Sequence, residues 1–274
     1  MIDSNPVMIA VAPNGARKTK QDHPSLPINA EELAATAANC LAAGACMIHL
    51  HVRDRQQGHT LDPDHYKTAI AAIRREAGSE LIVQITTEAG GIYHPRQQMQ
   101  TVREIRPEAV SLAIRELCPA AGDESVAADF FAWLYRERIS TQYILYSRED
   151  IQRFNALQSR GIIPQEEATI LLVLGKYSSD QQSSAEDLPP LLAEVKQQNS
   201  WWLCAFGAAE SACMHSAVEL GGHCRVGFEN NLYYPDGSTA PDNDSLVSLL
   251  AENAAKLGRR YASPAEAREL MGIR

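Results

Sequence analysis

The sequence predicts a single (β/α)8 barrel, the TIM-barrel fold of the α/β class, with one extra helix near its C-terminal end. Short runs rich in Val, Ile and Leu alternate with longer Ala-, Glu- and Leu-rich stretches of helical period, which is typical of βα units around a parallel sheet. Eight such pairs fit into 274 residues, an ordinary length for one barrel. No GxGxxG fingerprint follows the first apolar run, which argues against a doubly wound nucleotide-binding sheet.

The apolar runs place eight strands along the chain. They are expected at residues 7–11, 47–52, 81–85, 109–113, 142–145, 169–174, 201–205 and 224–227. Residues 175–184, after the sixth strand, resemble a linker in composition, but active-site loops of barrels lie at this position. We therefore expect residues 1–274 to form one catalytic domain without internal repeats.

The helices between these strands have recognisable ends. The first runs from the cap Asn29, with Glu32 at the third helical position, to Gly44. A last helix follows Ser263, where Ser-Pro-Ala-Glu supplies a cap, a first-turn proline and a capping glutamate; we expect it to pack on the outside of the barrel. The other helices are expected at residues 63–77, 95–105, 124–138, 148–160, 185–198, 210–220 and 242–257.

Composition and charge point to a small-molecule enzyme rather than a nucleic-acid or membrane protein. Apolar residues make up 45% and charged residues 22% of the chain, whose formal charge is -9. The basic stripe of a nucleic-acid binder is missing. Because the chain shows neither a signal-peptide pattern nor a membrane-length apolar run, we expect a cytoplasmic protein. Its six cysteines lack CxxC spacing and are expected to be reduced, buried thiols.

The strongest local motif is Met-Ile-His-Leu-His-Val at residues 47–52. Alternate side chains of a strand point to the same face, so His49 and His51 converge, and in a barrel this face is the interior. Two buried imidazoles are costly without partners, and a divalent ion can accept both neutral nitrogens. The motif predicts a metal site, with a pair of hydrogen-bonded core histidines as the alternative. The other histidines show no ligand spacing and are expected to be structural or solvent-facing; they are His23, His59, His65, His94, His215 and His223.

A third ligand is expected from another strand end. Residues 225–231 (RVGFENN) close the predicted eighth strand, and Glu229 offers a carboxylate there. Two histidines and one carboxylate leave coordination positions open for substrate, as in catalytic Zn²⁺ sites. An iron oxygenase uses the same ligand types, usually on another fold. Zinc is the predicted metal, and a solvated loop glutamate is the alternative for Glu229.

Further polar residues follow the predicted strands at the catalytic rim. Thr86 and Thr87 end the third strand before a glycine pair, a cradle suited to a substrate carboxylate. Asn14 and Arg17 follow the first strand and are expected to bind substrate, and Arg115 with Glu116 follows the fourth. Any one of these charges alone is more often a surface residue.

These motifs together resemble the β-keto acid cleavage enzymes, whose first characterised type is the 3-keto-5-aminohexanoate cleavage enzyme. The resemblance runs nearly end to end, and the HxHxR and RxGxExN segments at this separation are specific to the family. The matching segments are residues 12–17 (APNGAR), 22–24 (DHP), 26–28 (LPI), 43–45 (AGA), 48–54 (IHLHVRD), 84–87 (QITT), 173–175 (VLG), 221–223 (GGH) and 225–231 (RVGFENN).

The resemblance implies a zinc-dependent barrel that takes a β-keto acid and acetyl-CoA and yields acetoacetate and a new CoA thioester. The family's zinc ligands fall on His49, His51 and Glu229. Its carboxylate-holding hydroxyl falls on Thr86, and the arginine of its last-strand motif falls on Arg225. The resemblance also implies a homo-oligomer, with a tetramer favoured.

Two departures from the first type concern the substrate. Arg17 stands where that enzyme has a glutamate that meets the substrate amino group, which argues against 3-keto-5-aminohexanoate. We expect Arg17 to bind an anionic distal group, such as the second carboxylate of a β-keto diacid. Glu116 stands near a substrate-holding threonine, and its pairing with Arg17 or Arg115 is the alternative to contact with substrate.

Two other departures concern the chemistry. Asn230 replaces an aspartate that pairs with the arginine and acts as base, and an amide cannot take up a proton near neutral pH. Glu116 is the candidate replacement among the catalytic residues, which otherwise comprise Arg225 and Asn230. The loop after the sixth strand lacks the family's glycine pair, although Lys176 could still reach a CoA phosphate.

Three other functions compete with this interpretation. A CoA-independent, metal-dependent aldolase or lyase fits the altered loop. A non-catalytic barrel that binds metal and a keto acid fits the loss of the aspartate at Asn230. An amidohydrolase-type metal hydrolase fits least, because this class usually needs histidines from strands five and six, and the chain has none between His94 and His215.

Overall fold

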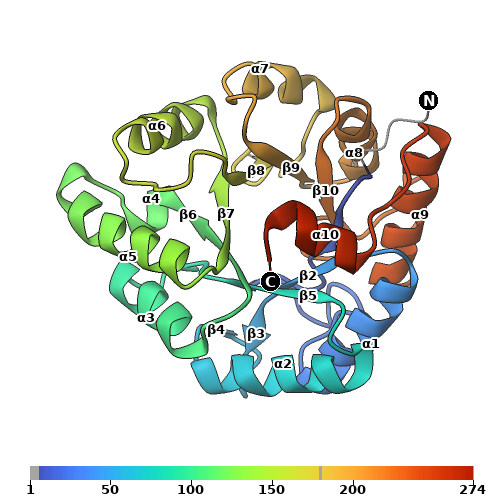
Figure 1. Cartoon of the computed structure of the whole chain (residues 1–274). Coiled ribbons are helices and arrows are strands. Elements are labelled where there is room, and N and C mark those ends of the chain that lie inside the picture. The colour runs from blue at the N-terminus through green and yellow to red at the C-terminus, as the bar shows by residue number, and fades with distance from the viewer. Residues whose placement is uncertain (1–5, 179–180, 274) are drawn as a thin grey trace.

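The computed structural model describes residues 6–178 and 181–273, and within them eight parallel strands close into a barrel (Figure 1). Hydrogen-bonded neighbours follow the order β1-β10-β9-β8-β7-β6-β5-β2, which confirms the predicted fold class. The barrel strands are β1 (Ile9–Val11), β2 (Met47–Leu50), β5 (Ile82–Thr86), β6 (Ala109–Ala113), β7 (Ser140–Leu145), β8 (Thr169–Leu174), β9 (Ser200–Ala205) and β10 (His223–Val226).

Helices surround this barrel (Figure 1). Asn29 forms the predicted capping box with Glu32, and Ser263 forms one with Glu266. The α-helices are α1 (Ala30–Ala42), α2 (Pro63–Ala77), α3 (Pro95–Ile105), α4 (Ile114–Leu117), α5 (Glu124–Arg136), α6 (Arg148–Ser159), α7 (Leu188–Leu192), α8 (Glu210–Glu219), α9 (Asn243–Lys256) and α10 (Pro264–Met271). Two 3-10 turns, η1 (Ala121–Asp123) and η2 (Ala185–Asp187), precede α5 and α7.

The last helix does not pack on the outer ring as expected. Figure 1 shows α10 across one end of the barrel rather than among the surrounding helices. Ala267 and Ile273 pack with Met8, Met47 and Ile82, which lie at or near the starts of their strands. The helix therefore closes the amino-terminal end of the barrel, because the apolar side chains of this end need a cover. The carboxyl ends of the strands remain for the functional site.

Two other elements differ from the sequence-based expectation. The helix predicted at 185–198 is wrong, since only η2 and the five-residue α7 form there. Pro189 and Pro190 lack amide hydrogens, so they cannot donate the hydrogen bonds that would continue an α-helix from residue 185. Asn199, just before β9, accepts a hydrogen bond from the Ala168 amide at 3.0 Å. The strand predicted at 47–52 ends at Leu50, and a separate hairpin of β3 (Val52–Arg53) and β4 (His59–Thr60) follows.

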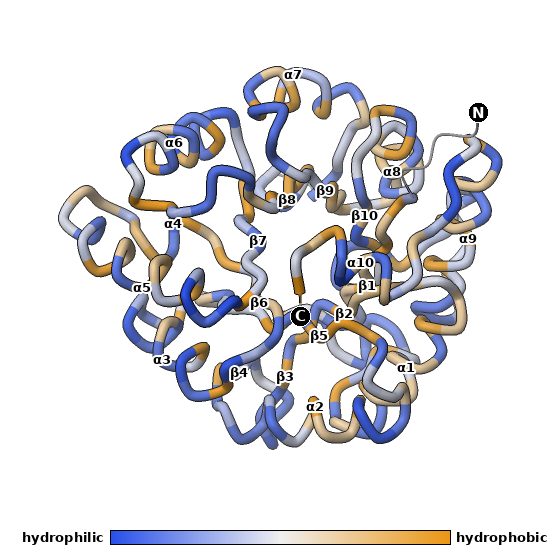
Figure 2. Tube along the Cα trace, in the orientation of Figure 1, coloured by the Kyte–Doolittle hydropathy of each residue, from blue (hydrophilic) through white to orange (hydrophobic). Residues whose placement is uncertain are grey.

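The hydrophobic core has two parts, as the barrel geometry requires. One lies between the strands and the helices, and the other fills the barrel interior above α10. In Figure 2 the outer helices have hydrophobic and hydrophilic residues within the same turns, as amphipathic helices do. All six cysteines are unpaired and buried, which confirms that prediction. No helix among the described residues is both long and apolar enough to cross a bilayer.

One buried carboxyl group makes the stability of the fold sensitive to pH. Glu210 begins α8 and is only 2% exposed. Its Oε2 accepts a hydrogen bond from Asn231 Nδ2 at 3.3 Å, whereas Oε1 has no hydrogen-bond partner among the described residues. Burial raises the pKa of Glu210 to about 8. The folded protein therefore holds a proton on Glu210 at a pH where the unfolded chain has released it.

Glu210→Gln is expected to flatten the pH dependence of stability. Between about pH 5 and pH 8 the folded state binds more protons than the unfolded state, so the free energy of unfolding of the native protein falls as pH rises through this window. The loss amounts to a few kcal/mol, at about 1.4 kcal/mol per pKa unit. Urea denaturation at several pH values measures it. Glu252→Gln, an exposed change on α9, is the control, and equal pH slopes for native protein and Glu210→Gln would contradict the prediction.

Candidate active site

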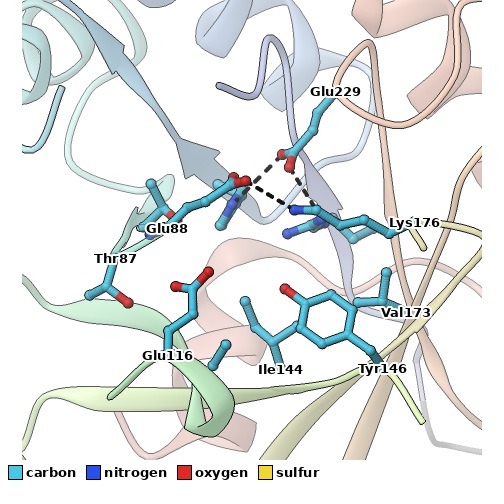
Figure 3. Close-up of a pocket in the computed structure, with 12 residues that line it drawn as sticks. Thr87, Glu88, Glu116, Ile144, Tyr146, Val173, Lys176 and Glu229 are labelled. Carbon is cyan, nitrogen blue, oxygen red and sulfur yellow. Dashed lines mark hydrogen bonds and ion pairs between the residues drawn. The ribbon is translucent and has the colours of Figure 1, made fainter. Parts of the chain in front are cut away.

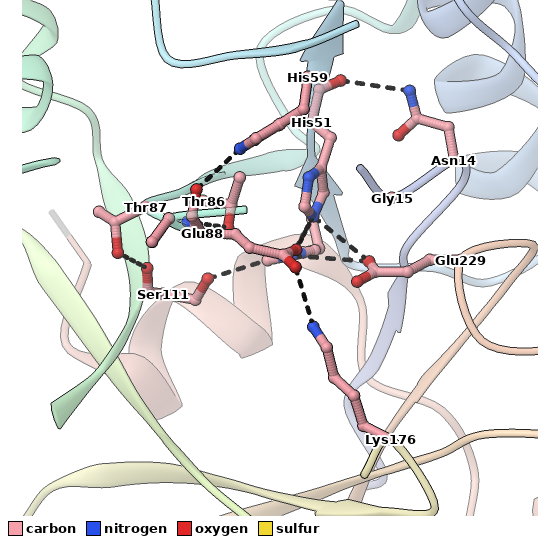
Figure 4. Close-up of polar contacts among 12 residues, drawn as sticks. Asn14, Gly15, His51, His59, Thr86, Thr87, Glu88, Ser111, Lys176 and Glu229 are labelled. Carbon is pink, nitrogen blue, oxygen red and sulfur yellow. Dashed lines mark hydrogen bonds and ion pairs between the residues drawn. The ribbon is translucent and has the colours of Figure 1, made fainter. Parts of the chain in front are cut away.

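The three predicted metal ligands come together at the carboxyl end of the barrel, and Figure 4 shows two of them, His51 and Glu229. His49 and His51 extend from β2, and Glu229 follows β10, with β1 between these strands. The Nε2 atoms of the histidines are 3.2 Å apart, and Glu229 Oε2 lies 3.7 Å from His49 Nε2 and 3.5 Å from His51 Nε2. All three side chains are buried. Two imidazoles and a carboxylate at this spacing can hold a metal ion.

Hydrogen bonds fix the His49 ring in the form that a metal requires. Its Nδ1 donates to Gln84 Oε1 at 2.8 Å, which leaves the lone pair of Nε2 directed toward His51. Gln84 is held in turn by its own donation to Gln142 Oε1 at 3.2 Å. Burial and the nearby Arg225 guanidinium keep the pKa of His49 well below its usual value. The ring is therefore uncharged, and its Nε2 can offer an electron pair to a metal ion.

Glu229 has the charge and the free oxygen that a metal site needs. Burial alone would raise its pKa, but Arg225 and the two histidines hold the pKa of this carboxyl well below its usual range. Its buried Oε2 has no hydrogen-bond partner among the described residues. A buried anion facing two imidazole nitrogens is satisfied by a cation. The donors present thus fit a divalent ion.

Two glycines allow the Glu229 segment to approach the end of β1. Gly15 has φ +60, and a Cβ there would lie 2.6 Å from Glu229 Cγ. Gly227 has φ +130, and its Cβ would lie 2.6 Å from the Ala12 carbonyl oxygen. Lys18 Nζ donates to the backbone carbonyl of Glu229 at 2.6 Å. The glycines of both motifs are therefore required for the position of this ligand.

The loop after β1 is tied to β3 and to the residue before it by side chains that donate to backbone carbonyls. Arg53 donates to the Gly15 carbonyl from Nε at 3.0 Å and from Nη2 at 2.6 Å. Asn14 Nδ2 donates to the carbonyls of Pro27 at 3.0 Å and His51 at 3.3 Å. Asn14 was predicted to bind substrate; its buried Oδ1 has no partner among the described residues, so a substrate role stays a prediction.

A pocket adjoins the metal-ligand group and is here called the inner chamber (Figure 3). It contains four of the predicted substrate and catalytic residues, whereas Asn14, Arg17 and Asn230 do not line it. Its lining comprises His49, Thr86, Thr87, Glu88, Ala113, Glu116, Ile144, Tyr146, Val173, Lys176, Arg225 and Glu229.

The two threonines at the end of β5 differ in what their hydroxyl groups bind. Thr86 Oγ1 accepts a hydrogen bond from the Glu88 amide at 3.0 Å, so its own proton remains free for a ligand. Thr87 Oγ1 donates to the Ser111 carbonyl at 3.2 Å, which uses its proton inside the protein. Thr86 is thus the better placed donor toward a substrate carboxylate.

Arg225 and Asn230, both predicted to be catalytic, meet at a cysteine that the sequence did not single out. Arg225 Nη2 donates to Cys204 Sγ at 3.1 Å, and Asn230 Nδ2 donates to the same sulfur at 2.8 Å. Burial raises the pKa of the Cys204 thiol to about 11, so the sulfur is protonated near neutral pH. Arg225 also lies 3.7 Å from Glu229 Oε1. Cys204 therefore orients Arg225, while Asn230 lies behind the chamber lining.

Glu116 faces the inner chamber from α4 (Figure 3). Its Oε2 accepts hydrogen bonds from the Ala89 amide and from Gln98 Nε2, each at 3.0 Å. Burial raises its pKa above the usual value, which suits a carboxyl group that exchanges a proton near neutral pH. The alternative in which Glu116 pairs with Arg115 is wrong, because Arg115 binds Asp150. No pairing of Glu116 with Arg17 is found among the described residues either.

Glu88 and Lys176 form an ion pair in the chamber that sequence reasoning missed. Lys176 Nζ lies 3.2 Å from Glu88 Oε1 (Figures 3 and 4). Burial opposes the charge on Lys176, but Glu88 and Glu229 raise its pKa, so it is a cation. Both residues follow barrel strands, and this position in the sequence was the signal that could have identified them as site residues. The pairing itself joins loops 88 positions apart.

A second, wider pocket adjoins the inner chamber and is here called the outer cavity. Glu88, Lys176 and Glu229 line both spaces. Arg17 lines the outer cavity, where its side chain is exposed and forms no hydrogen bond or ion pair within residues 6–178 and 181–273. The other lining residues are Asn14, Gly15, Ala16, Lys18, Asp22, Gln181 and Phe206.

Comparisons with known proteins show which family the whole chain resembles. The profile of the β-keto acid cleavage enzyme family matches residues 6–273. A 3-keto-5-aminohexanoate cleavage enzyme of Fusobacterium nucleatum is 30% identical over 274 residues, which cover 98% of each chain. A 3-oxoadipate:acetyl-CoA acetyltransferase of Cupriavidus necator is 28% identical over 277 residues, covering 98% of this chain and 96% of the relative.

A solved structure supports the fold. The binary complex of ObcA with oxaloacetate superposes with a TM-score of 0.75 at 17% identity, covering 91% of this chain and 68% of that chain. The family match extends over almost the whole length, and the two sequence relatives cover nearly all of it as well. The resemblance read from the motifs is thereby confirmed: the chain belongs to the β-keto acid cleavage enzyme family.

Proposed function

We propose that this protein is a zinc-dependent enzyme that exchanges acyl groups between a β-keto acid and acetyl-CoA. The bond between C2 and C3 of the keto acid breaks, its acyl group passes to the CoA sulfur, and the acetyl group joins the released two-carbon acid as acetoacetate. The observation that carries the proposal is the group of His49, His51 and Glu229 at the edge of a chamber that also contains Thr86 and Arg225.

A metal ion held by His49, His51 and Glu229 would supply Lewis-acid polarisation of the keto oxygen. Zinc suits two imidazoles and one carboxylate with a position left open for substrate. Arg225 brings a positive charge to the chamber that stabilises developing negative charge on the substrate. The small, largely buried chamber excludes bulk water and so strengthens these charge interactions.

The remaining residues of the chamber bind the substrate carboxylate and move a proton. The Thr86 hydroxyl donates a hydrogen bond to the substrate carboxylate. Glu116 exchanges a proton with the substrate carbon, since its raised pKa brings its titration closer to neutral pH. Asn230 does not take this role, because an amide has no basic site.

The substrate class is inferred from Arg17, because the outer cavity as a whole has three basic and three acidic residues in its lining. Lys18 donates to the Glu229 carbonyl and Lys176 pairs with Glu88, which leaves the exposed Arg17 guanidinium to bind a carboxylate. We infer that the substrate is a β-keto acid with a second, distal carboxylate. The relative from Cupriavidus necator is named for 3-oxoadipate, which is such a diacid. Faster turnover of a cationic β-keto acid than of β-ketoglutarate or 3-oxoadipate would contradict this inference.

A product assay tests the function and separates it from its alternatives. The purified, zinc-loaded protein is incubated with acetyl-CoA and a panel of β-keto acids, and acetoacetate and new thioesters are measured by mass spectrometry. Both products together support acyl exchange. Cleavage of the keto acid without CoA identifies a metal-dependent aldolase or lyase, and binding without product identifies a keto-acid-binding barrel. Light scattering of the same sample tests the homotetramer that we propose from the family resemblance.

Thr86→Val is expected to weaken substrate binding more than it slows turnover. Valine removes the hydroxyl that faces the chamber, and a lost hydrogen bond to a charged group costs about 1.5–3 kcal/mol. KM for the keto acid should therefore rise by about tenfold to a hundredfold. Steady-state kinetics measure it, with Thr87→Val as the matched comparison, because that hydroxyl donates to the Ser111 carbonyl. A larger rise in KM for Thr87→Val would reverse the assignment.

A further inference from the structure

Glu88 lies between the inner chamber and the outer cavity, where the proposed reaction gives it no task. Its side chain is 13% exposed, and its two oxygens face different groups. Oε1 lies 3.2 Å from Lys176 Nζ, and Oε2 lies 3.9 Å from His51 Nε2 (Figure 4). The carboxylate thus connects the lysine with a metal ligand.

The distance between Glu88 and His51 is compatible with ligation of one ion by both. Two ligand atoms of one ion are never farther apart than the sum of their bond lengths, about 4.2 Å for zinc with nitrogen and oxygen ligands. The 3.9 Å between Glu88 Oε2 and His51 Nε2 satisfies this limit. Glu88 is not part of the tight group formed by the other three donors, so its carboxylate must rotate about the side-chain torsions to join them.

The backbone of Glu88 is fixed, so only its side chain is free to make this rotation. His59 Nε2 donates to the Glu88 carbonyl at 2.7 Å, and the Glu88 amide donates to Thr86 Oγ1 at 3.0 Å. The next turn packs closely as well, since a Cβ at Gly90 would lie 2.9 Å from His59 Cδ2. The loop therefore holds the carboxylate beside the metal ligands.

The ion pair of Glu88 with Lys176 also suits a cation site. Lys176 Nζ lies 3.2 Å from Glu88 Oε1 and offsets part of the cost of burying the carboxylate. Lys176 occupies only Oε1, which leaves Oε2 for an ion.

We propose that Glu88 is a displaceable fourth ligand of the metal ion in the substrate-free protein. An incoming β-keto acid replaces it with its own carboxylate, so that one oxygen–metal bond breaks, another forms, and the charge around the ion is unchanged. The released Glu88 stays paired with Lys176. This inference rests on the metal centre of the proposed function, and it assigns to this chain a substrate-exchange step at that centre.

Cobalt substitution tests the proposal, because the visible absorption of Co²⁺ depends on the number and type of its ligands. Native protein, Glu88→Gln and Glu88→Asp are loaded with Co²⁺, and their spectra and Co²⁺ dissociation constants are measured without and with saturating acetoacetate. Both variants should differ from the native spectrum and bind Co²⁺ about tenfold more weakly. With acetoacetate bound, the three spectra should converge, since Glu88 has then left the ion in the native protein too.

Aspartate separates ligation from charge, because it keeps the carboxylate but loses one methylene of reach. If Glu88→Asp matches the native spectrum and affinity while Glu88→Gln does not, Glu88 acts through charge alone and the proposal is overturned. Identical spectra for all three proteins overturn it as well. Glu116→Gln, a carboxylate of the same chamber without contact to His51, should keep the native spectrum. If the native protein binds no Co²⁺, the metal centre of the proposed function fails instead.

Discussion

His49→Ala is expected to remove the metal ion and to lower kcat/KM by on the order of a thousandfold. The histidine contributes one of the three buried donors that form the candidate group among the described residues, and its Nε2 lies 3.2 Å from that of His51. Loss of the ion removes the polarisation of the keto oxygen, on which the proposed reaction depends. Metal analysis by mass spectrometry and steady-state kinetics measure both effects.

The control for this change is His215→Ala, which removes a half-exposed histidine of α8 that pairs only with Glu219. It should leave metal content and turnover unchanged. Full metal occupancy in His49→Ala would contradict the ligand assignment. Full activity after complete removal of metal from the native protein would contradict metal dependence itself.

Glu116→Gln is expected to lower kcat by about a hundredfold to ten-thousandfold while metal content and KM change little. Glutamine keeps the size of the side chain but cannot exchange a proton. Because burial raises the pKa of Glu116, the ionised form that acts as base is present above that pKa, and native activity should fall as pH drops through it. The residual activity of the variant should lack this acid limb.

A pH–rate profile of kcat/KM for both proteins makes the measurement. Glu104→Gln is the matched control, since Glu104 is an exposed carboxylate of α3 that binds only Gln100. An unchanged kcat in Glu116→Gln, or an acid limb that persists, would show that another group moves the proton.

The barrel and the grouping of the three candidate metal ligands were predictable because both depend on short-range pattern. Alternation along one strand places His49 and His51 on one face, and parallel strands bring their ends to one side of the barrel, where Glu229 lies. Composition and spacing contain this information directly. The family motifs then identified the same three residues.

The contacts around the metal ligands were not predictable in the same way. The pair of Glu88 and Lys176 and the donation of Arg225 to Cys204 join different strands or loops, so no local pattern reports them. The role of Glu116 was only partly predictable. Its position after the fourth strand placed it at the rim, but its partners Ala89 and Gln98 depend on tertiary packing.

Helix α10 has a consequence for the order of events during turnover. It covers the amino-terminal end of the barrel, whereas the residues that line both cavities lie at and after the carboxyl ends of the strands. We therefore expect both substrates to enter, and both products to leave, at the carboxyl end. The keto acid and acetoacetate must occupy the inner chamber in succession, so acetoacetate should act as a competitive inhibitor toward the keto acid.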